Sequence, residues 1–250
     1  MVFFIMKNFI NKDYQLLYSD DYISYIKKDD FTIVIPVLNE EKAIGKVLYN
    51  VKKEGYKNIL VVDGYSNDNT VKIASNNGGR VIYQKGIGKT GAIKTAIKLV
   101  KTKYMLIMDG DCTYDPKEIY KFYKYILNFD EVIGSRTYGK TNIPILNRLG
   151  NFIINTLFNL FFGTNLVDVC SGMYAIRTDF AKKLILKTKS FDVEVEIAAQ
   201  AALNGRIISV PINYYKRVGK QKLRPFKHGF QILNTIIKMG LFTRTYFRKI

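Results

Sequence analysis

Residues 31–40 read FTIVIPVLNE, a run of β-branched and aromatic residues followed by a polar turn. Such a run predicts a short buried strand, and Pro36, which has no amide hydrogen, predicts the end of its hydrogen-bonded ladder. Asn39 can cap a helix after the turn. The apolar positions of that helix recur at helical spacing, at Ala43, Ile44, Val47, Leu48 and Val51.

The order of strand and helix repeats along the chain up to residue 134. Further helices are expected at 66–77, at 90–100 and from Pro116, and further strands at 58–62, 80–83, 104–108 and 131–134. This alternation predicts an α/β fold with a mostly parallel central sheet and helices on both faces. Open sheets of this kind bind ligands beyond the carboxyl ends of their strands, where the turns at 36–40, 63–66 and 109–111 fall.

After residue 140 the pattern is less regular. We expect a long apolar helix at 143–162, a turn and strand at 168–177, a helix at 192–203 and a pair of strands around Pro211 at 206–215. The basic segment from residue 216 carries an apolar stripe of Phe230, Leu233, Ile236, Ile237 and Leu241. Neither a repeat nor a linker is visible, so we expect an N-terminal extension at 1–30, one domain at 31–225 and a basic amphipathic tail at 226–250.

Composition limits the class of protein. The 250 residues are 48% hydrophobic and include 18 Tyr and 16 Phe, which suits one globular core and argues against disorder. The net charge of +18 favours polyanionic partners, namely nucleic acid, anionic lipid headgroups or phosphorylated substrates, unless it reflects a lysine-rich proteome.

Two cysteines, Cys112 and Cys170, offer no disulfide framework, which favours a reducing compartment. The first ten residues lack a cleavage site for a signal peptide. No apolar run reaches the ~18–20 residues of a spanning helix. We therefore expect neither a signal peptide nor a transmembrane helix.

Asp109-Gly110-Asp111 directly follows the apolar strand expected at 104–108. Two carboxylates one residue apart can hold a hard cation, Mg²⁺ or Mn²⁺, against diphosphate oxygens, and Gly110 leaves room for the ligand. The triplet alone is also compatible with an ordinary Asp-Gly turn. Two further acids, Glu40 and Asp63, follow neighbouring strands, and this context favours the metal site.

Three separated motifs, IPVLNE at 35–40, VVDGYSNDNT at 61–70 and DGD at 109–111, resemble those of the family 2 glycosyltransferases of the GT-A fold. The resemblance extends over about residues 31–230, and it would make 31–225 the catalytic domain. Within the family the sequence is most similar to the dolichyl- and polyprenyl-phosphate sugar synthases. That similarity rests on IGSR at 133–136, DVCSG at 168–172, FDVE at 191–194, VPI at 210–212 and YKRVGKQKLRP at 215–225. The sequence departs from the family pattern at Gly64, Thr113, Gln221 and His228.

The resemblance implies a role for each matching position. The metal would be held by Asp109 and Asp111. The nucleotide-sugar would be bound by these two acids and by Pro36, Leu38, Glu40, Val62, Asp63, Gly110, Arg217 and Lys222. Arg136 would meet the lipid phosphate, because a guanidinium fork matches phosphate oxygens. The catalytic residues would be Asp111, Arg136, Arg217 and Lys222.

The implied reaction is the inverting transfer of a hexose from GDP-mannose or UDP-glucose to polyprenyl or dolichyl phosphate. A lipid phosphate is already anionic and can attack without a base, whereas a sugar hydroxyl needs one. If the acceptor is instead a saccharide or a lipid-linked oligosaccharide, Asp192 or Glu194 could be that base.

Other functions fit less well. Gly86-Ile-Gly88-Lys89-Thr90 is similar to the end of a phosphate-binding P-loop, but Tyr83 stands where the motif needs its first glycine. A nucleotidyltransferase would need a glycine-rich triphosphate loop beside the first strand, and residues 36–41 contain no glycine. A non-enzymatic basic binding protein would give no reason for Asp109 and Asp111. We expect no nucleic-acid partner.

The apolar helix at 143–162 and the basic tail suggest peripheral contact with a membrane surface. Core packing, a homodimer and a small membrane partner are the alternatives. With a lipid acceptor, the expected location is the cytoplasmic face of a membrane.

Overall fold

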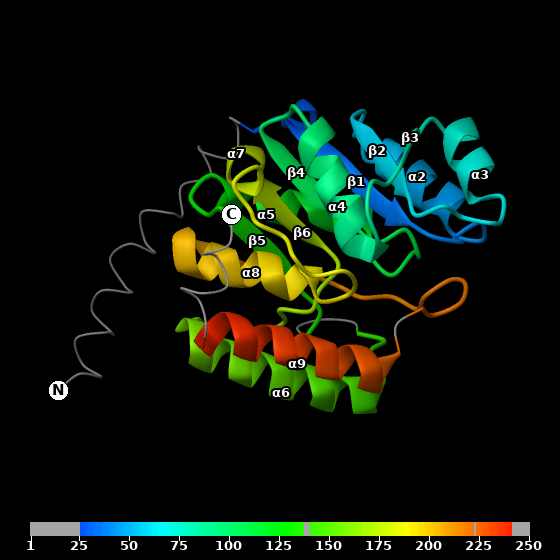
Figure 1. Ribbon diagram of the computed structural model, residues 1–250. Helices are drawn as coiled ribbons and strands as arrows, with labels where there is room; N and C mark the ends of the chain where they lie inside the picture. The colour runs from blue at the N-terminus through cyan, green and yellow to red at the C-terminus, as the bar shows by residue number, and fades with distance from the viewer. Residues whose placement is uncertain (1–25, 138–140, 223, 242–250) are drawn as a thin grey trace.

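A computed structural model describes residues 26–137, 141–222 and 224–241 (Figure 1). Most of the extension expected at 1–30 therefore lies outside the described residues. The core is a seven-stranded sheet in the order β3-β2-β1-β4-β6-β5-β7. Its strands are β1 (Phe31–Val37), β2 (Ile59–Asp63), β3 (Arg80–Tyr83), β4 (Tyr104–Ile107), β5 (Glu131–Ser135), β6 (Tyr174–Arg177) and β7 (Ile207–Pro211).

The helices are η2 (Lys28–Asp30), α2 (Ile44–Lys53), α3 (Thr70–Asn76), α4 (Gly88–Leu99), η3 (Pro116–Ile119), α5 (Tyr120–Ile126), α6 (Ile145–Phe162), α7 (Thr178–Ala181), α8 (Val193–Asn204) and α9 (Pro225–Leu241). They cover both faces of the sheet, because successive strand residues bury their side chains on opposite sides. Val34 and Val62 pack in one core with α4, α6, α8 and α9. Ile35 and Val61 pack in a second core with α2, α3 and α5. The predicted α/β architecture is confirmed.

The sheet is parallel except at β6, which runs antiparallel to both β4 and β5. One expectation was wrong: 206–215 does not form a pair of strands. It contains the single strand β7, which pairs in parallel with β5 and ends at Pro211. The chain then leaves the sheet, and the amide of Tyr215 donates to the Thr113 carbonyl in the turn after β4.

Strand β1 continues one residue beyond the predicted stop, to Val37. The amide of Ile33 donates toward β2, at Asn58, and the carbonyl of Val34 accepts the amide of Met108 from the β4 side. Backbone groups of residues two apart in a strand point to the same side, so the backbone of Pro36 faces β4, as that of Val34 does. Because β4 ends at Ile107, the missing amide hydrogen of Pro36 costs no ladder bond. The two strands separate here.

The strand order changes direction between β1 and β4. β2 and β3 lie on one side of β1 in the sheet, and β4 lies on its other side. Such a reversal of strand order leaves the turns after the two central strands pointing apart, which is where open α/β sheets bind ligands.

Helix α9 lies along α6 on one side of the molecule (Figure 1). It buries Ile232, Ile236 and Met239 in the core. The apolar stripe predicted for the tail is therefore divided: Ile236 is buried, whereas Phe230, Ile237 and Leu241 are exposed. None of the helices in the described ranges has both the length and the hydropathy to cross a membrane.

Candidate functional site

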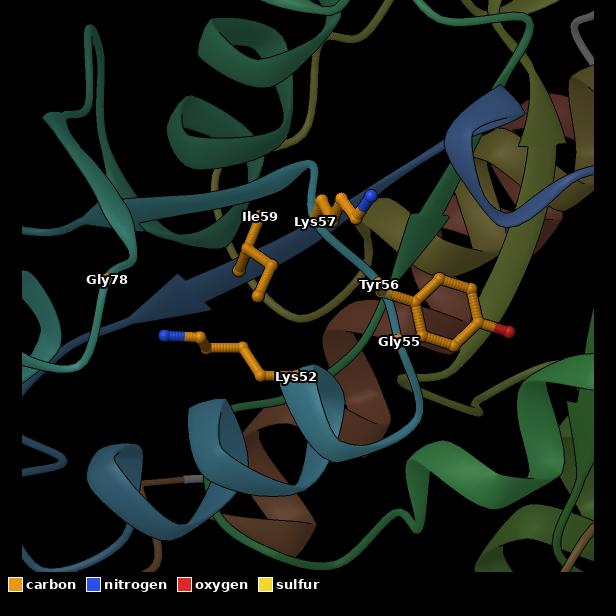
Figure 2. A pocket seen from close by; sticks show the side chains of 6 residues that line it. All are labelled: Lys52, Gly55, Tyr56, Lys57, Ile59 and Gly78. Atoms are coloured by element: carbon orange, nitrogen blue, oxygen red, sulfur yellow. The ribbon is translucent and has the colours of Figure 1, made fainter.

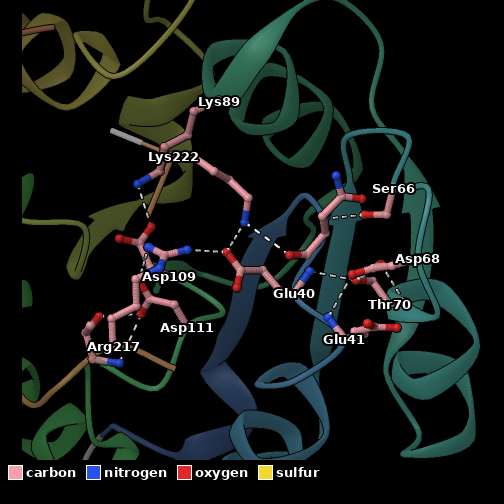
Figure 3. Close-up of polar contacts among 12 residues, drawn as sticks. Glu40, Glu41, Ser66, Asp68, Thr70, Lys89, Asp109, Asp111, Arg217 and Lys222 are labelled. Atoms are coloured by element: carbon pink, nitrogen blue, oxygen red, sulfur yellow. Dashed lines mark hydrogen bonds and ion pairs between the residues drawn. The ribbon is translucent and has the colours of Figure 1, made fainter. Parts of the chain in front are cut away.

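Acidic residues lie in three turns at the carboxyl edge of the sheet, and Figure 3 shows three of them, Glu40, Asp109 and Asp111, close together. Glu40 follows β1, Asp63 ends β2, and Asp109 and Asp111 follow β4. β1 pairs in parallel with both β2 and β4, so the three turns emerge at the same edge. The structure thus brings together Glu40, Asp109 and Asp111, whereas Asp63 lies in the neighbouring turn with Ser66 as its partner.

A basic loop, residues 212–222, crosses over these acids. The amide of Val218 donates to the Asp111 carbonyl at 2.9 Å. One guanidinium nitrogen of Arg217 donates to Asp111 Oδ2 at 2.6 Å, and the other donates to Glu40 Oε1. Lys222 also donates to Glu40 Oε1. The loop therefore ties the turn after β1 to the turn after β4 through two cations.

The two metal-ligand candidates differ in their surroundings. The side chain of Asp109 is 30% exposed and that of Asp111 is 4% exposed. Burial, and then the charge of Asp109, raise the pKa of the Asp111 carboxyl, although Thr113 and Arg217 oppose them. Thr113 donates both its amide and its hydroxyl to Asp111 Oδ1. The departure from the family pattern at Thr113 thus provides a group that orients this carboxylate.

Lys89 is a site residue that the sequence analysis did not identify. Its ammonium lies 2.6 Å from Asp109 Oδ1 and 2.5 Å from Glu194 Oε1. Burial lowers the pKa of Lys89, but the carboxylates of Asp109 and Glu194 outweigh it and hold that pKa well above its usual value. The available signal is the glycine-flanked lysine at 86–90, which the family resemblance places in a turn that opens a helix near the donor.

Asp63 is occupied by the backbone of its own turn. Its two oxygens accept the amide of Ser66 at 2.9 Å and the hydroxyl of Ser66 at 2.6 Å. The Ser66 hydroxyl also accepts the amide of Asn39, so Asp63 fixes the turn after β2 against the turn after β1. Of the other predicted nucleotide contacts, Val62 is buried and Leu38 is exposed. Pro36 is half-buried.

Packing against β1 gives Gly110 a structural role beside the one predicted for it near the ligand. A Cβ at this position would lie 2.8 Å from Val37 Cγ1 and 3.2 Å from Ile35 Cγ2, both on β1. Gly172 in the DVCSG motif has a comparable role that the sequence did not reveal. A Cβ there would lie 2.2 Å from Asp109 Oδ2, so only glycine admits this carboxylate.

Arg136 is held by Asp168 from the same motif. Its Nε lies 2.6 Å from Asp168 Oδ2 and its Nη2 lies 2.8 Å from Asp168 Oδ1. The guanidinium also lies over the ring of Tyr214, at 5.2 Å from the centroid. This bidentate pair fixes the direction of the Arg136 guanidinium, and, although burial lowers the pKa of Arg136, the Asp168 carboxylate outweighs burial and raises it.

The two candidate bases face different partners. Asp192 accepts hydrogen bonds from Thr235 and Gln231 of α9, so it ties that helix to α8. Glu194 faces Lys89 at the acidic centre. Burial raises the pKa of Glu194, against the lowering effect of Lys89, and a raised pKa suits a base near neutral pH. Only Glu194 is placed to act beside Asp109.

The donor atoms fit a hard divalent cation. Among the described residues, no group of three or more His, Cys, Asp or Glu side chains gathers into a metal cage. Mg²⁺ needs no such cage, since one or two carboxylates and substrate phosphates complete its shell with water. Two buried polar atoms at the site, Glu40 Oε2 and Arg217 Nε, also have no hydrogen-bond partner within the described structure.

A hollow of about 270 Å³ lies at the other edge of the sheet, where β2 begins (Figure 2). Its lining contains lysines and no carboxylate, and consists of Lys52, Gly55, Tyr56, Lys57, Ile59 and Gly78. It is remote from the acids along the strands, so we place the chemistry at the carboxyl edge.

Comparison with known proteins agrees with this geometry. Residues 32–185 match the model of the family described as Glycosyl transferase family 2. The chain is 34% identical to a dolichyl-phosphate hexose transferase of Haloferax volcanii, over 85% of this chain and 95% of that protein. It is 30% identical to a UDP-N-acetylglucosamine–dolichyl-phosphate N-acetylglucosaminyltransferase of Methanococcus voltae, over 83% of this chain and 96% of that protein.

The fold is similar to that of glucosyl-3-phosphoglycerate synthase from Mycobacterium tuberculosis, solved with Mn²⁺, UDP-glucose and phosphoglyceric acid. The TM-score is 0.66 at 18% identity, over 84% of this chain and 79% of that one. The likeness confirms the predicted GT-A architecture.

Proposed function

The chain belongs to glycosyl transferase family 2 and is a glycosyltransferase, and from this premise we propose that it transfers a hexose from a nucleotide diphosphate sugar to polyprenyl or dolichyl phosphate. GDP-mannose and UDP-glucose are the proposed donors. The observation that carries the proposal is the placement of Arg217 and Lys222 over Asp111 and Glu40. The names of the two archaeal relatives, both of which specify dolichyl phosphate, support the same acceptor.

On the donor side, we propose that Asp109 and Asp111 hold Mg²⁺ or Mn²⁺. Such an ion supplies positive charge to the leaving diphosphate. Lys89 orients Asp109, and Thr113 orients Asp111. The turns with Pro36, Leu38, Glu40, Val62, Asp63 and Gly110 form the proposed nucleotide-binding edge.

On the acceptor side, Arg217 and Lys222 are proposed to exchange part of their contact with Glu40 and Asp111 for phosphate oxygens. Two anions must approach each other in this reaction, so cations that move with a loop lower its electrostatic cost. Arg136, oriented by Asp168, is proposed to bind the lipid phosphate from the neighbouring strand end.

The proposed displacement is a single step with inversion. A phosphate oxygen of the acceptor attacks the anomeric carbon, and the bond to the donor diphosphate breaks on the opposite side. The attacking oxygen carries no proton, so the chain's residues provide alignment and charge and no general base. The buried Glu194 beside Asp109 favours the alternative acceptor, a saccharide hydroxyl, for which it would be the base.

Glu194→Gln separates these acceptors. With a phosphate acceptor we expect transfer to polyprenyl phosphate to stay within about tenfold of wild type, because no proton has to be removed. Asp192→Asn, whose carboxylate faces α9, is the matched control. A loss of about a thousandfold in Glu194→Gln alone, with loss of the acidic limb of the pH profile, would assign the base and the saccharide acceptor.

We also propose that α6 and α9 rest on the cytoplasmic face of a membrane. Each helix exposes an apolar stripe, formed by Ile145, Leu149, Phe152 and Leu160 on α6 and by Phe226, Phe230, Ile237 and Leu241 on α9. Neither helix contains an acidic residue, and Arg148, Lys227 and Lys238 are exposed on them. Apolar stripes with surrounding cations suit anionic lipid headgroups. Phe226 closely follows Lys222, so a lipid chain on α9 would bring its phosphate to the basic loop.

Vesicle flotation tests this contact. Phe226 and Phe230 are 83% and 78% exposed, so changing both to Ser should not affect folding but should abolish binding to phosphatidylglycerol vesicles. The control is Tyr49→Ser, at an aromatic residue of α2 that is 63% exposed, and this variant should bind like wild type. Absence of wild-type binding at every salt concentration would reject the membrane contact. If the double variant then halved the mass of a wild-type dimer, this face would be a dimer interface instead.

A further inference from the structure

Left-handed backbone at residues other than glycine is concentrated around the site. Within the described ranges it occurs at Asn39 (φ 50°), Tyr65 (φ 65°) and Cys112 (φ 67°), in the turns after β1, β2 and β4. Asparagine adopts this conformation readily, whereas a bulky aromatic residue does so only at an energetic cost. Tyr65 is therefore strained in a turn where glycine would be relaxed.

Tyr65 also stacks on a second exposed aromatic residue. Its ring centroid lies 5.3 Å from that of Tyr83, with an interplanar angle of 17°. Tyr65 is 61% exposed and Tyr83 is 51% exposed. Stacking of the two rings offsets part of the backbone strain, but it leaves more than half of each side chain exposed to solvent. Backbone strain that persists at the edge of a site, as it does at Tyr65, indicates a role in binding.

The pair lies at the proposed nucleotide-binding edge. Tyr65 follows Asp63 and Gly64, and a Cβ at Gly64 would lie 3.3 Å from the Val37 carbonyl and 3.6 Å from Leu38 Cβ. The turns after β1 and β2 thus pack directly on each other. Tyr83 ends β3, which lies beyond β2 from β1 and β4. In strand order Tyr65 is therefore the ring nearer the acids, and Tyr83 supports it from the outer side.

We propose that Tyr65, supported by Tyr83, stacks on the nucleobase of the donor nucleotide. This inference rests on the proposed function and adds a base-contacting residue to it. Every base has a π-face, so the ring serves a purine or a pyrimidine, with more overlap for a purine. Strain at Tyr65 is the cost of holding its ring in this position before the donor arrives.

The experiment compares the affinity for a nucleotide with thermal stability. Isothermal titration with UDP and with GDP, each with MnCl₂, is performed on wild type, Tyr65→Gly, Tyr65→Phe and Tyr83→Ala. Tyr120→Ala, a change at an equally exposed tyrosine on α5, is the matched control. Tyr65→Gly should bind the nucleotide about 10- to 100-fold more weakly and yet unfold at a higher temperature, because glycine relieves the strain. Tyr65→Phe should bind like wild type, and Tyr83→Ala should bind more weakly with the Tyr65 backbone unchanged.

Three results would overturn the proposal. If Tyr65→Gly gained stability and kept its affinity, strain and exposure would be incidental to binding. If Tyr65→Phe lost as much affinity as Tyr65→Gly, the hydroxyl and not the ring face would be the contact. A wild type that binds neither nucleotide would remove the proposed donor itself, and with it this inference. Loss confined to the Tyr65 variants, in a chain that still transfers sugar, leaves the proposed function intact.

Discussion

Asp111→Asn is expected to lower kcat/KM for hexose transfer by about a thousandfold, the largest effect of any single substitution at the site. An amide binds a hard cation far less strongly than a carboxylate, and loss of several kcal/mol of charge stabilisation on the leaving diphosphate corresponds to that factor. The fold should survive. Burial and the neighbouring Asp109 already raise the pKa of the Asp111 carboxyl, so its charge is costly in the free protein. Thr113 can still donate to the amide oxygen.

The control for Asp111→Asn is Asp115→Asn, which makes the same change four residues along the chain. Asp115 caps η3 by accepting the amide of Lys117, a bond that asparagine can also accept. Both variants should unfold near the wild-type temperature, and only Asp111→Asn should lose transfer. Near-normal activity of Asp111→Asn would remove Asp111 from the metal site.

Arg217→Gln is expected to lower kcat/KM by about a hundredfold. Arg217 donates from two nitrogens to Asp111 and Glu40, and its proposed role is to present the same fork to phosphate oxygens. A hydrogen bond to a charged group contributes ~1.5–3 kcal/mol, and a hundredfold loss, ~2.7 kcal/mol, corresponds to one to two such bonds. Arg217→Lys keeps the charge but not the fork, so it should recover only part of the activity.

Lys220→Gln tests whether Arg217→Gln acts only by removing a positive charge from the loop. Lys220 is an exposed lysine of the same basic loop. The Lys220→Gln variant should retain wild-type activity, because the charge of an exposed side chain is largely screened by water and salt. Equal losses in Arg217→Gln and Lys220→Gln would mean that the general charge of the loop, and not the Arg217 fork, carries the effect.

Local signals in the sequence were sufficient for the architecture and for the edge that carries the site. Apolar runs located β1, β2 and β4, and the acids that follow them are Glu40, Asp63 and Asp111. Parallel strands bring their carboxyl ends together, so no contact had to be known in advance. The extent of β1 was less predictable, because the consequence of Pro36 depended on where β4 ends.

Contacts between distant segments could not be predicted in this way. Lys89 meets Asp109 and Glu194 only after α4 and α8 have packed on the same face of the sheet. The requirement for glycine at Gly172 depends on a carboxylate from another strand end. The single strand at 207–211 likewise depends on a distant partner, since it pairs in parallel with β5. The residues after it do not return to the sheet as a second strand, and they cover the site instead.

The central claim is metal-dependent transfer of a hexose to a lipid phosphate. Labelled GDP-mannose or UDP-glucose is offered to the wild-type chain with a short polyprenyl phosphate or the matching polyprenol, in MnCl₂ or in EDTA. Label should enter the lipid fraction only with polyprenyl phosphate and Mn²⁺, and restoring Mn²⁺ should reverse the effect of EDTA. Transfer that persists in EDTA, or that proceeds equally well to polyprenol, would contradict the claim.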